Sequence, residues 1–135
     1  MSGSRNFRRI LLATLGVGLV AWLCYQPAAA QQAGQIVRVA RIVVDAAQLP
    51  QYKAALKEGM ETAVRVEPGV LALNAVYEKE NPTHVMVLEV YASAAAYQAH
   101  LQTPHFKKYK ATTKDMVKSL ELVDVEPIAL ATKAK

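Results

Sequence analysis

The sequence is poor in cysteine, since only one of its 135 residues, Cys24, carries a thiol. Cys24 lies in an N-terminal apolar segment that has the features of a removable leader, so we expect the mature chain to contain no cysteine. Such a chain forms no disulfide, offers no thiol nucleophile and binds no metal through thiolate. The fold must then rest on an ordinary hydrophobic core, which roughly a hundred residues can supply.

Metal-binding patterns and strong charge are missing as well. There is no H-x-x-x-H motif and no dense carboxylate cluster, and His100 and His105 are five residues apart, a poor spacing for two ligands on one helix. We therefore expect no metal. The net charge is +5, and it falls to +2 without the three arginines of the leader. A charge of +2 does not indicate nucleic acid or an anionic membrane surface as a partner.

The leader is recognised by three features in order. Three arginines in residues 5–9 precede an apolar run from Ile10 to Cys24, and the small residues Ala28 to Ala30 follow. The run of about 15 residues is shorter than the ~20 that span a bilayer core, which favours a cleaved signal peptide over an uncleaved anchor. We predict a signal peptide at 1–30 and one periplasmic or secreted domain at 31–135, with no membrane attachment after cleavage. The choice between general and twin-arginine export stays open.

The mature chain alternates between strand and helix patterns. Runs rich in β-branched residues predict four strands, and apolar residues at helical spacing predict helices between them. The order is βαββαβ, with the second helix broken near Gln102 and restarted by Thr103-Pro104. This order predicts a ferredoxin-like α+β fold with a four-stranded antiparallel sheet and helices on one face. The expected strands are Ile36–Val44, Val70–Glu78, Val85–Ala92 and Leu120–Ala129, and the expected helices are Leu49–Val66, Ala94–Leu101 and Pro104 to about Ser119.

The second and third expected strands are largely apolar on both faces. Helices on one side of a sheet bury only one of its faces. We therefore expect a second copy of the chain to cover the other face, which predicts a homodimer.

Two motifs carry a resemblance to a known family. Glu67-Pro68-Gly69 ends the first expected helix, and the run from Ala99 to Phe106 reads A-H-L-Q-T-P-H-F. On these motifs the chain, from about Ile36 to Pro127, resembles the antibiotic biosynthesis monooxygenase family. The resemblance implies a dimeric α+β barrel with a cavity between sheet and helices in each subunit. Some members of that family oxidise polycyclic phenols or quinols with molecular oxygen and without metal or flavin, whereas others degrade haem.

Oxygenation without a cofactor needs a base for the phenolic proton and a partner for the resulting anion. His100 and His105 are the leading candidates for proton transfer. The alternative is that His105 packs at the helix N-terminus and that His100 caps a neighbouring carbonyl. Asn74 and Glu89 are candidates for orienting the substrate oxygens. Asn74 could instead satisfy a backbone group at the dimer interface, and Glu89 could instead pair with an arginine of the first strand. The aromatic residues expected to contact the substrate are Tyr91, Phe106 and Tyr109.

With the leader, these residues and the family resemblance together imply an exported cofactor-independent monooxygenase that acts on a small aromatic phenol or quinol with molecular oxygen. The alternative is a dimeric module that binds an aromatic or lipophilic molecule without chemistry. Haem is a less favoured ligand, because the haem-degrading relatives place a tryptophan near His100 and a histidine near Lys110, and neither type of residue is present at those places.

Overall fold

The computed structural model describes residues 34–133, so the predicted signal peptide and its cleavage after Ala30 lie outside the described residues. Within the described part, no helix is both long and apolar enough to cross a membrane. The elements, in chain order, are β1 (Ile36–Val44), η1 (Ala46–Gln48), α2 (Leu49–Val66), β2 (Val70–Tyr77), β3 (His84–Tyr91), α3 (Ala94–Gln102), α4 (Pro104–Thr113) and β4 (Val117–Asp124).

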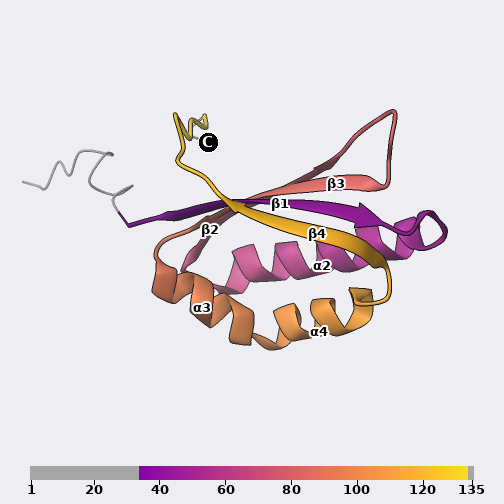
Figure 1. The fold of residues 1–135 in the computed structure, drawn as a ribbon. Helices are drawn as coiled ribbons and strands as arrows, with labels where there is room; N and C mark the ends of the chain where they lie inside the picture. Colours follow the sequence, from indigo (N-terminus) through magenta and orange to yellow (C-terminus); the bar gives the residue numbers. More distant parts are fainter. Residues whose placement is uncertain (1–33, 134–135) are drawn as a thin grey trace, which may run out of the picture.

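The four strands form one antiparallel sheet in the order β2-β3-β1-β4. Helices α2, α3 and α4 all lie on one face of this sheet (Figure 1). The ferredoxin-like α+β fold predicted from the sequence is confirmed. Alternation along the strands turns Ala40 and Ile42 of β1 and Val85 and Val87 of β3 toward the helices, where all four are buried together with Tyr52 of α2.

The break between α3 and α4 has a local cause. Ser93 caps α3, because its hydroxyl accepts a hydrogen bond from the Ala96 amide at 3.1 Å. Thr103 ends α3 and begins α4, since its hydroxyl donates to the His100 carbonyl at 2.8 Å and accepts from the Phe106 amide at 3.3 Å. Pro104 follows as an early helical residue, where its missing N–H costs nothing. This break places His100 and His105 on two different helices.

The last helix and the last strand were predicted wrongly. The apolar spacing predicts a helix to about Ser119 and a strand over Leu120–Ala129, whereas α4 ends at Thr113 and β4 covers Val117–Asp124. The reason is pairing across the sheet, because β4 lies in register with β1 from Asp124 opposite Arg38 to Val117 opposite Val44. Hydrogen bonds to a neighbouring strand fix residues 117–119 as strand, whatever their helical spacing.

The face of the sheet opposite the helices is largely apolar. Val37 and Val90, which are register partners, are buried there, whereas Val76 and Met86, also partners, are 61% and 43% exposed. Most of this face therefore has no cover within the described part of one chain.

Candidate active site

A cavity of about 130 Å³ lies between the sheet and helices α2, α3 and α4. Its wall is mostly apolar and includes the charged or titratable side chains of Glu89, His100, His105 and Lys110. Six of the seven site residues proposed from the sequence line it: Glu89, Tyr91, His100, His105, Phe106 and Tyr109. An apolar cavity with a few convergent polar groups is the usual form of a small-molecule site.

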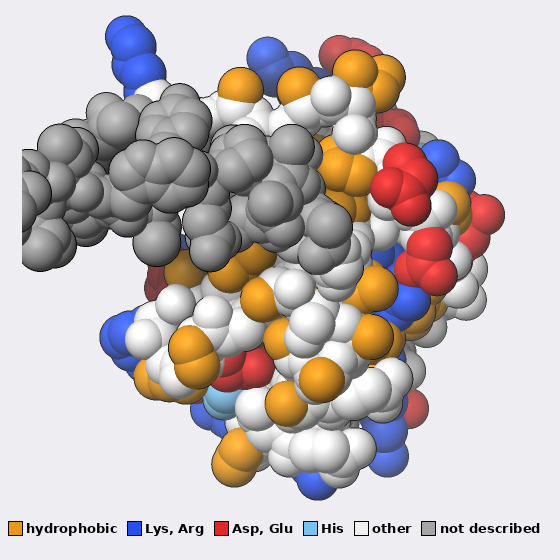
Figure 2. All heavy atoms as spheres, turned by 90° about the vertical axis from the view of Figure 1, so that its left-hand side faces the viewer, with side chains coloured by type: hydrophobic (Ala, Val, Ile, Leu, Met, Phe, Trp, Pro, Cys, Tyr) orange, Lys and Arg blue, Asp and Glu red, His pale blue; other side chains and the backbone are white. Residues whose placement is uncertain are grey.

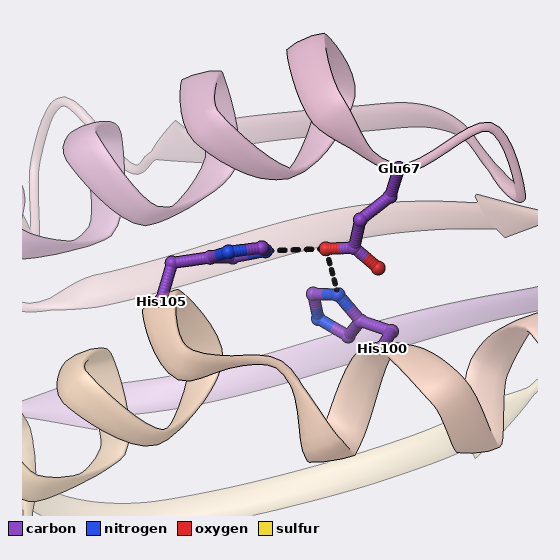
Figure 3. A group of neighbouring side chains, drawn as sticks. All are labelled: Glu67, His100 and His105. Atoms are coloured by element: carbon purple, nitrogen blue, oxygen red, sulfur yellow. Dashed lines mark hydrogen bonds and ion pairs between the residues drawn. The ribbon is translucent and has the colours of Figure 1, made fainter.

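Three side chains from different parts of the chain meet (Figure 3), and two of them, His100 and His105, line this cavity. Oε1 of Glu67, at the end of α2, lies 2.9 Å from Nδ1 of His100 on α3 and 2.5 Å from Nε2 of His105 on α4. The side chains are 12%, 8% and 17% exposed, respectively. We call this group the Glu67–His100–His105 triad.

The triad fixes which ring nitrogens carry protons. An ionised carboxylate only accepts hydrogen bonds, so Nδ1 of His100 and Nε2 of His105 are the donors. In a neutral imidazole the other nitrogen then carries a lone pair. Nε2 of His100 is therefore the nitrogen of that ring free to accept a proton, and Glu67 is placed to stabilise the imidazolium that results.

Aromatic rings hold the His100 imidazole in place. Its ring centroid lies 4.8 Å from that of Phe106 and 5.4 Å from that of Tyr91. The surface view from the α3 side shows histidine and carboxylate atoms side by side among uncharged and apolar atoms (Figure 2). Rings packed at these distances restrict rotation of the imidazole and keep its orientation toward the cavity.

Glu89 provides a carboxylate in the cavity wall. It accepts a hydrogen bond from the Tyr91 hydroxyl at 3.0 Å. Burial raises the pKa of Glu89, although the Tyr91 hydrogen bond and the nearby His100 act in the opposite direction. Arg38, opposite Glu89 in register, forms its ion pair with Asp124 at 2.6 Å, and its charge also favours the ionised form of Glu89. Arg41 pairs with Glu121 at 3.0 Å.

Tyr109 uses its hydroxyl within the core. The hydroxyl groups of Tyr109 and Tyr52 lie 2.9 Å apart, and burial raises the pKa of both phenols. Tyr109 therefore contributes a neutral ring to the cavity wall.

Asn74 lies apart from this group. Its neighbour Leu73 lines the cavity, and adjacent strand residues point to opposite faces of a sheet. Asn74 is exposed on the open face, opposite Leu88 in register. Within one described chain it has no route to the cavity.

Comparison with known proteins decides the family. The model of antibiotic biosynthesis monooxygenases matches residues 35–112. The chain belongs to this family. A candidate antibiotic biosynthesis monooxygenase of Bacteroides thetaiotaomicron, known from a crystal structure, is 52% identical, with a TM-score of 0.73 over 77% of this chain and 99% of its own.

Two further crystal structures are similar to this chain in fold. A candidate monooxygenase of Lactobacillus acidophilus is 32% identical with a TM-score of 0.65, over 66% of this chain and 42% of its own. A candidate antibiotic biosynthesis monooxygenase of Caulobacter crescentus is 26% identical with a TM-score of 0.63, over 70% of this chain and 92% of its own. A search of curated proteins found no match. Family membership indicates monooxygenase chemistry on a small molecule.

Sequence reasoning assigned no site role to Glu67, whose carboxylate joins the two histidines. We treated it as part of the signal that ends the first helix, and it does provide the C-cap of α2. Its partners lie 33 and 38 residues further along the chain, beyond the reach of local patterns. The available signal was its place in the Glu67-Pro68-Gly69 motif, which carries the family resemblance together with the segment that holds both histidines.

Proposed function

We propose that this protein is an exported, cofactor-independent monooxygenase that oxidises a small aromatic phenol or quinol with molecular oxygen. The observation that supports this most strongly is the buried His100 imidazole, held by Glu67 at the wall of an apolar cavity. A histidine oriented by a carboxylate is an arrangement that supports general base catalysis.

In the proposed reaction His100 accepts the phenolic proton of the substrate at Nε2. The resulting phenolate is electron-rich enough to reduce oxygen. One oxygen atom enters the substrate, and the other leaves as water with two hydrogens from the substrate. The inserted atom becomes the carbonyl of a former CH₂ group, or the hydroxyl of a ring carbon while the quinol is oxidised to a quinone. Glu67 stabilises the imidazolium, and Glu89 orients a ring oxygen, while Phe106 and Tyr91 pack against the aromatic ring.

Replacement of His100 by alanine tests this assignment. The variant is expected to lose oxygen uptake with naphthoquinols and anthrones, whereas the matched variant His84→Ala, in the hairpin outside the cavity, is expected to keep it. Uptake at the wild-type rate by His100→Ala would remove this residue from the mechanism. If wild-type protein takes up no oxygen but is thermally stabilised by the same compounds, the apolar cavity serves as the site of a binding module instead.

Export is part of the proposal and rests on the composition of residues 1–30. N-terminal sequencing of protein recovered from the periplasm is expected to begin near Gln31. Recovery of an intact N-terminus from the cytoplasm would contradict export.

The homodimer is also proposed, with the apolar open face of the sheet as its interface. Support comes from the exposed partners Val76 and Met86, because an apolar patch of this kind on a small domain marks an interaction surface. Met86→Glu is expected to shift the mass measured by light scattering from dimer to monomer, whereas Lys79→Glu, in the hairpin turn, is expected not to. A monomeric wild-type protein would contradict the dimer.

A further inference from the structure

We propose that Glu67, His100 and His105 form a site for one divalent first-row transition-metal ion beside the cavity. This inference goes beyond the proposed oxygenation, which needs no metal, and does not depend on it. The ligand atoms are one carboxylate oxygen and two imidazole nitrogens, all within 4.8 Å of one another. Two histidines and one carboxylate are the ligand set of three-ligand zinc sites and of non-haem iron sites.

The spacing argument against metal fails for this geometry. It treated His100 and His105 as two ligands on one helix, five residues apart. The break at Thr103 places them on separate helices, and Glu67 supplies a third ligand from the end of α2 (Figure 3). Because all three side chains are largely buried, little water competes for the ion.

Metal binding requires a modest movement of one side chain. A tetrahedral ion with bonds of about 2.0–2.2 Å holds its ligand atoms roughly 3.4 Å apart. The oxygen–nitrogen distances of 2.9 and 2.5 Å must therefore widen slightly, while the two nitrogens draw together. His105 lies in the first turn of α4 and is the more exposed histidine, so we assign the movement to its side chain.

The protonation change is small as well. The two nitrogens that donate to Glu67 become ligands when each neutral imidazole moves its proton to its other ring nitrogen. On His100 that proton then sits at Nε2. Glu89 lines the same cavity, and we assign it to accept this proton in a hydrogen bond, as outer-shell carboxylates do for metal-bound histidines. Lys110 also lines the cavity, but its side chain is exposed, so water screens its charge.

An ion bound at this site would keep a coordination position open toward the cavity. Three protein ligands leave at least one position on a tetrahedral ion, and His100 and His105 border the cavity directly. A phenolate, catecholate or carboxylate oxygen is the kind of ligand that fits such a position.

Titration with cobalt(II) tests the site without any need for turnover. The protein is expressed from its full-length sequence without a polyhistidine tag, stripped with a chelator, and titrated while visible absorption and heat are recorded. We expect one cobalt ion per chain, with ligand-field bands that disappear when zinc displaces it. Glu67→Gln and His105→Asn are expected to weaken binding by at least the ~10- to 100-fold known for loss of an outer-shell partner.

His84→Asn is the matched control, since this histidine contacts Asn81 and Glu78 in the hairpin and lies outside the triad. It is expected to bind cobalt like the wild type. Absence of saturable binding by the wild type overturns the site, even if the variants fail to fold. Binding retained by both triad variants, or lost in His84→Asn, overturns it too. None of these cobalt-binding results changes the oxygen uptake expected of metal-free protein. The metal site and the proposed oxygenation can therefore be refuted separately.

Discussion

Replacing Glu67 by glutamine is expected to slow substrate oxidation by roughly 10²- to 10⁴-fold while leaving the fold intact. The substitution keeps the size of the side chain and one carbonyl oxygen, but removes the charge that faces both histidines. In the proposed reaction that charge matters most after His100 has accepted the proton, because the carboxylate then faces an imidazolium. Ground-state binding of a neutral phenol should change little.

The magnitude follows from the distance. A carboxylate oxygen 2.9 Å from a charged imidazole nitrogen contributes up to about 6 kcal/mol at an effective dielectric constant of ~20. The dipole of the amide retains part of this attraction, so a loss of about 3 to 5 kcal/mol is expected. At about 1.4 kcal/mol per tenfold change in rate, that loss gives the stated range.

The assay is oxygen uptake at saturating and limiting substrate, which separates kcat from KM. We expect kcat to fall and KM to stay within about threefold, since the lost interaction forms after binding. Glu58→Gln is the matched control, because Glu58 pairs with Lys108 on the surface and is 63% exposed. A Glu67→Gln variant with an unchanged kcat, or a Glu58→Gln variant with an equal loss, would refute the role of the triad.

Three further predictions concern the fold around the site. Burial raises the pKa of Glu89 in the folded state, so the stability linked to this group is present at low pH and is lost as pH rises. At pH values well above 4.5, Glu89→Gln should therefore raise the urea concentration at the unfolding midpoint. Below pH 4.5 the substitution should change this midpoint less. A Cβ on Gly69 would lie 2.5 Å from a side-chain atom of α3, so Gly69→Ala should lower the melting temperature. A Cβ on Gly59, inside α2, would lie 3.5 Å from its nearest neighbour, so Gly59→Ala should stabilise the fold by about 0.5–1 kcal/mol. Tyr52→Phe leaves the buried Tyr109 hydroxyl without its partner and should lower the free energy of unfolding, measured by chemical denaturation, by about 1–3 kcal/mol. A loss near zero would contradict this prediction.

Elements with local signals could be predicted from the sequence. The sequence predicts the first strand over Ile36–Val44 and the first helix over Leu49–Val66, and the structure has both elements with these limits. The helix carries Pro50 near its start and the Glu67-Pro68-Gly69 stop at its end, so neighbouring residues fix both limits. The last helix and strand lack such signals, and their boundary depends on pairing with a strand some eighty residues earlier.

The candidate site shows the same division. His100 and His105 could be chosen from a local motif, and the structure places both on one cavity. Glu67 could not, because its contact with them depends on how α2 packs against α3 and α4. Asn74 was selected as a polar residue in an apolar strand, but the pattern alone does not say which face of the sheet meets the helices.

Oxygen uptake by the metal-stripped protein tests the central claim most directly. The mature protein is incubated with a panel of naphthoquinols and anthrones under ¹⁸O₂, and uptake and product mass are followed together. The account predicts uptake well above autoxidation, one labelled oxygen atom in each product molecule, and loss of both in His100→Ala. Uptake no faster than autoxidation across the panel, or product without label, would contradict a cofactor-independent monooxygenase.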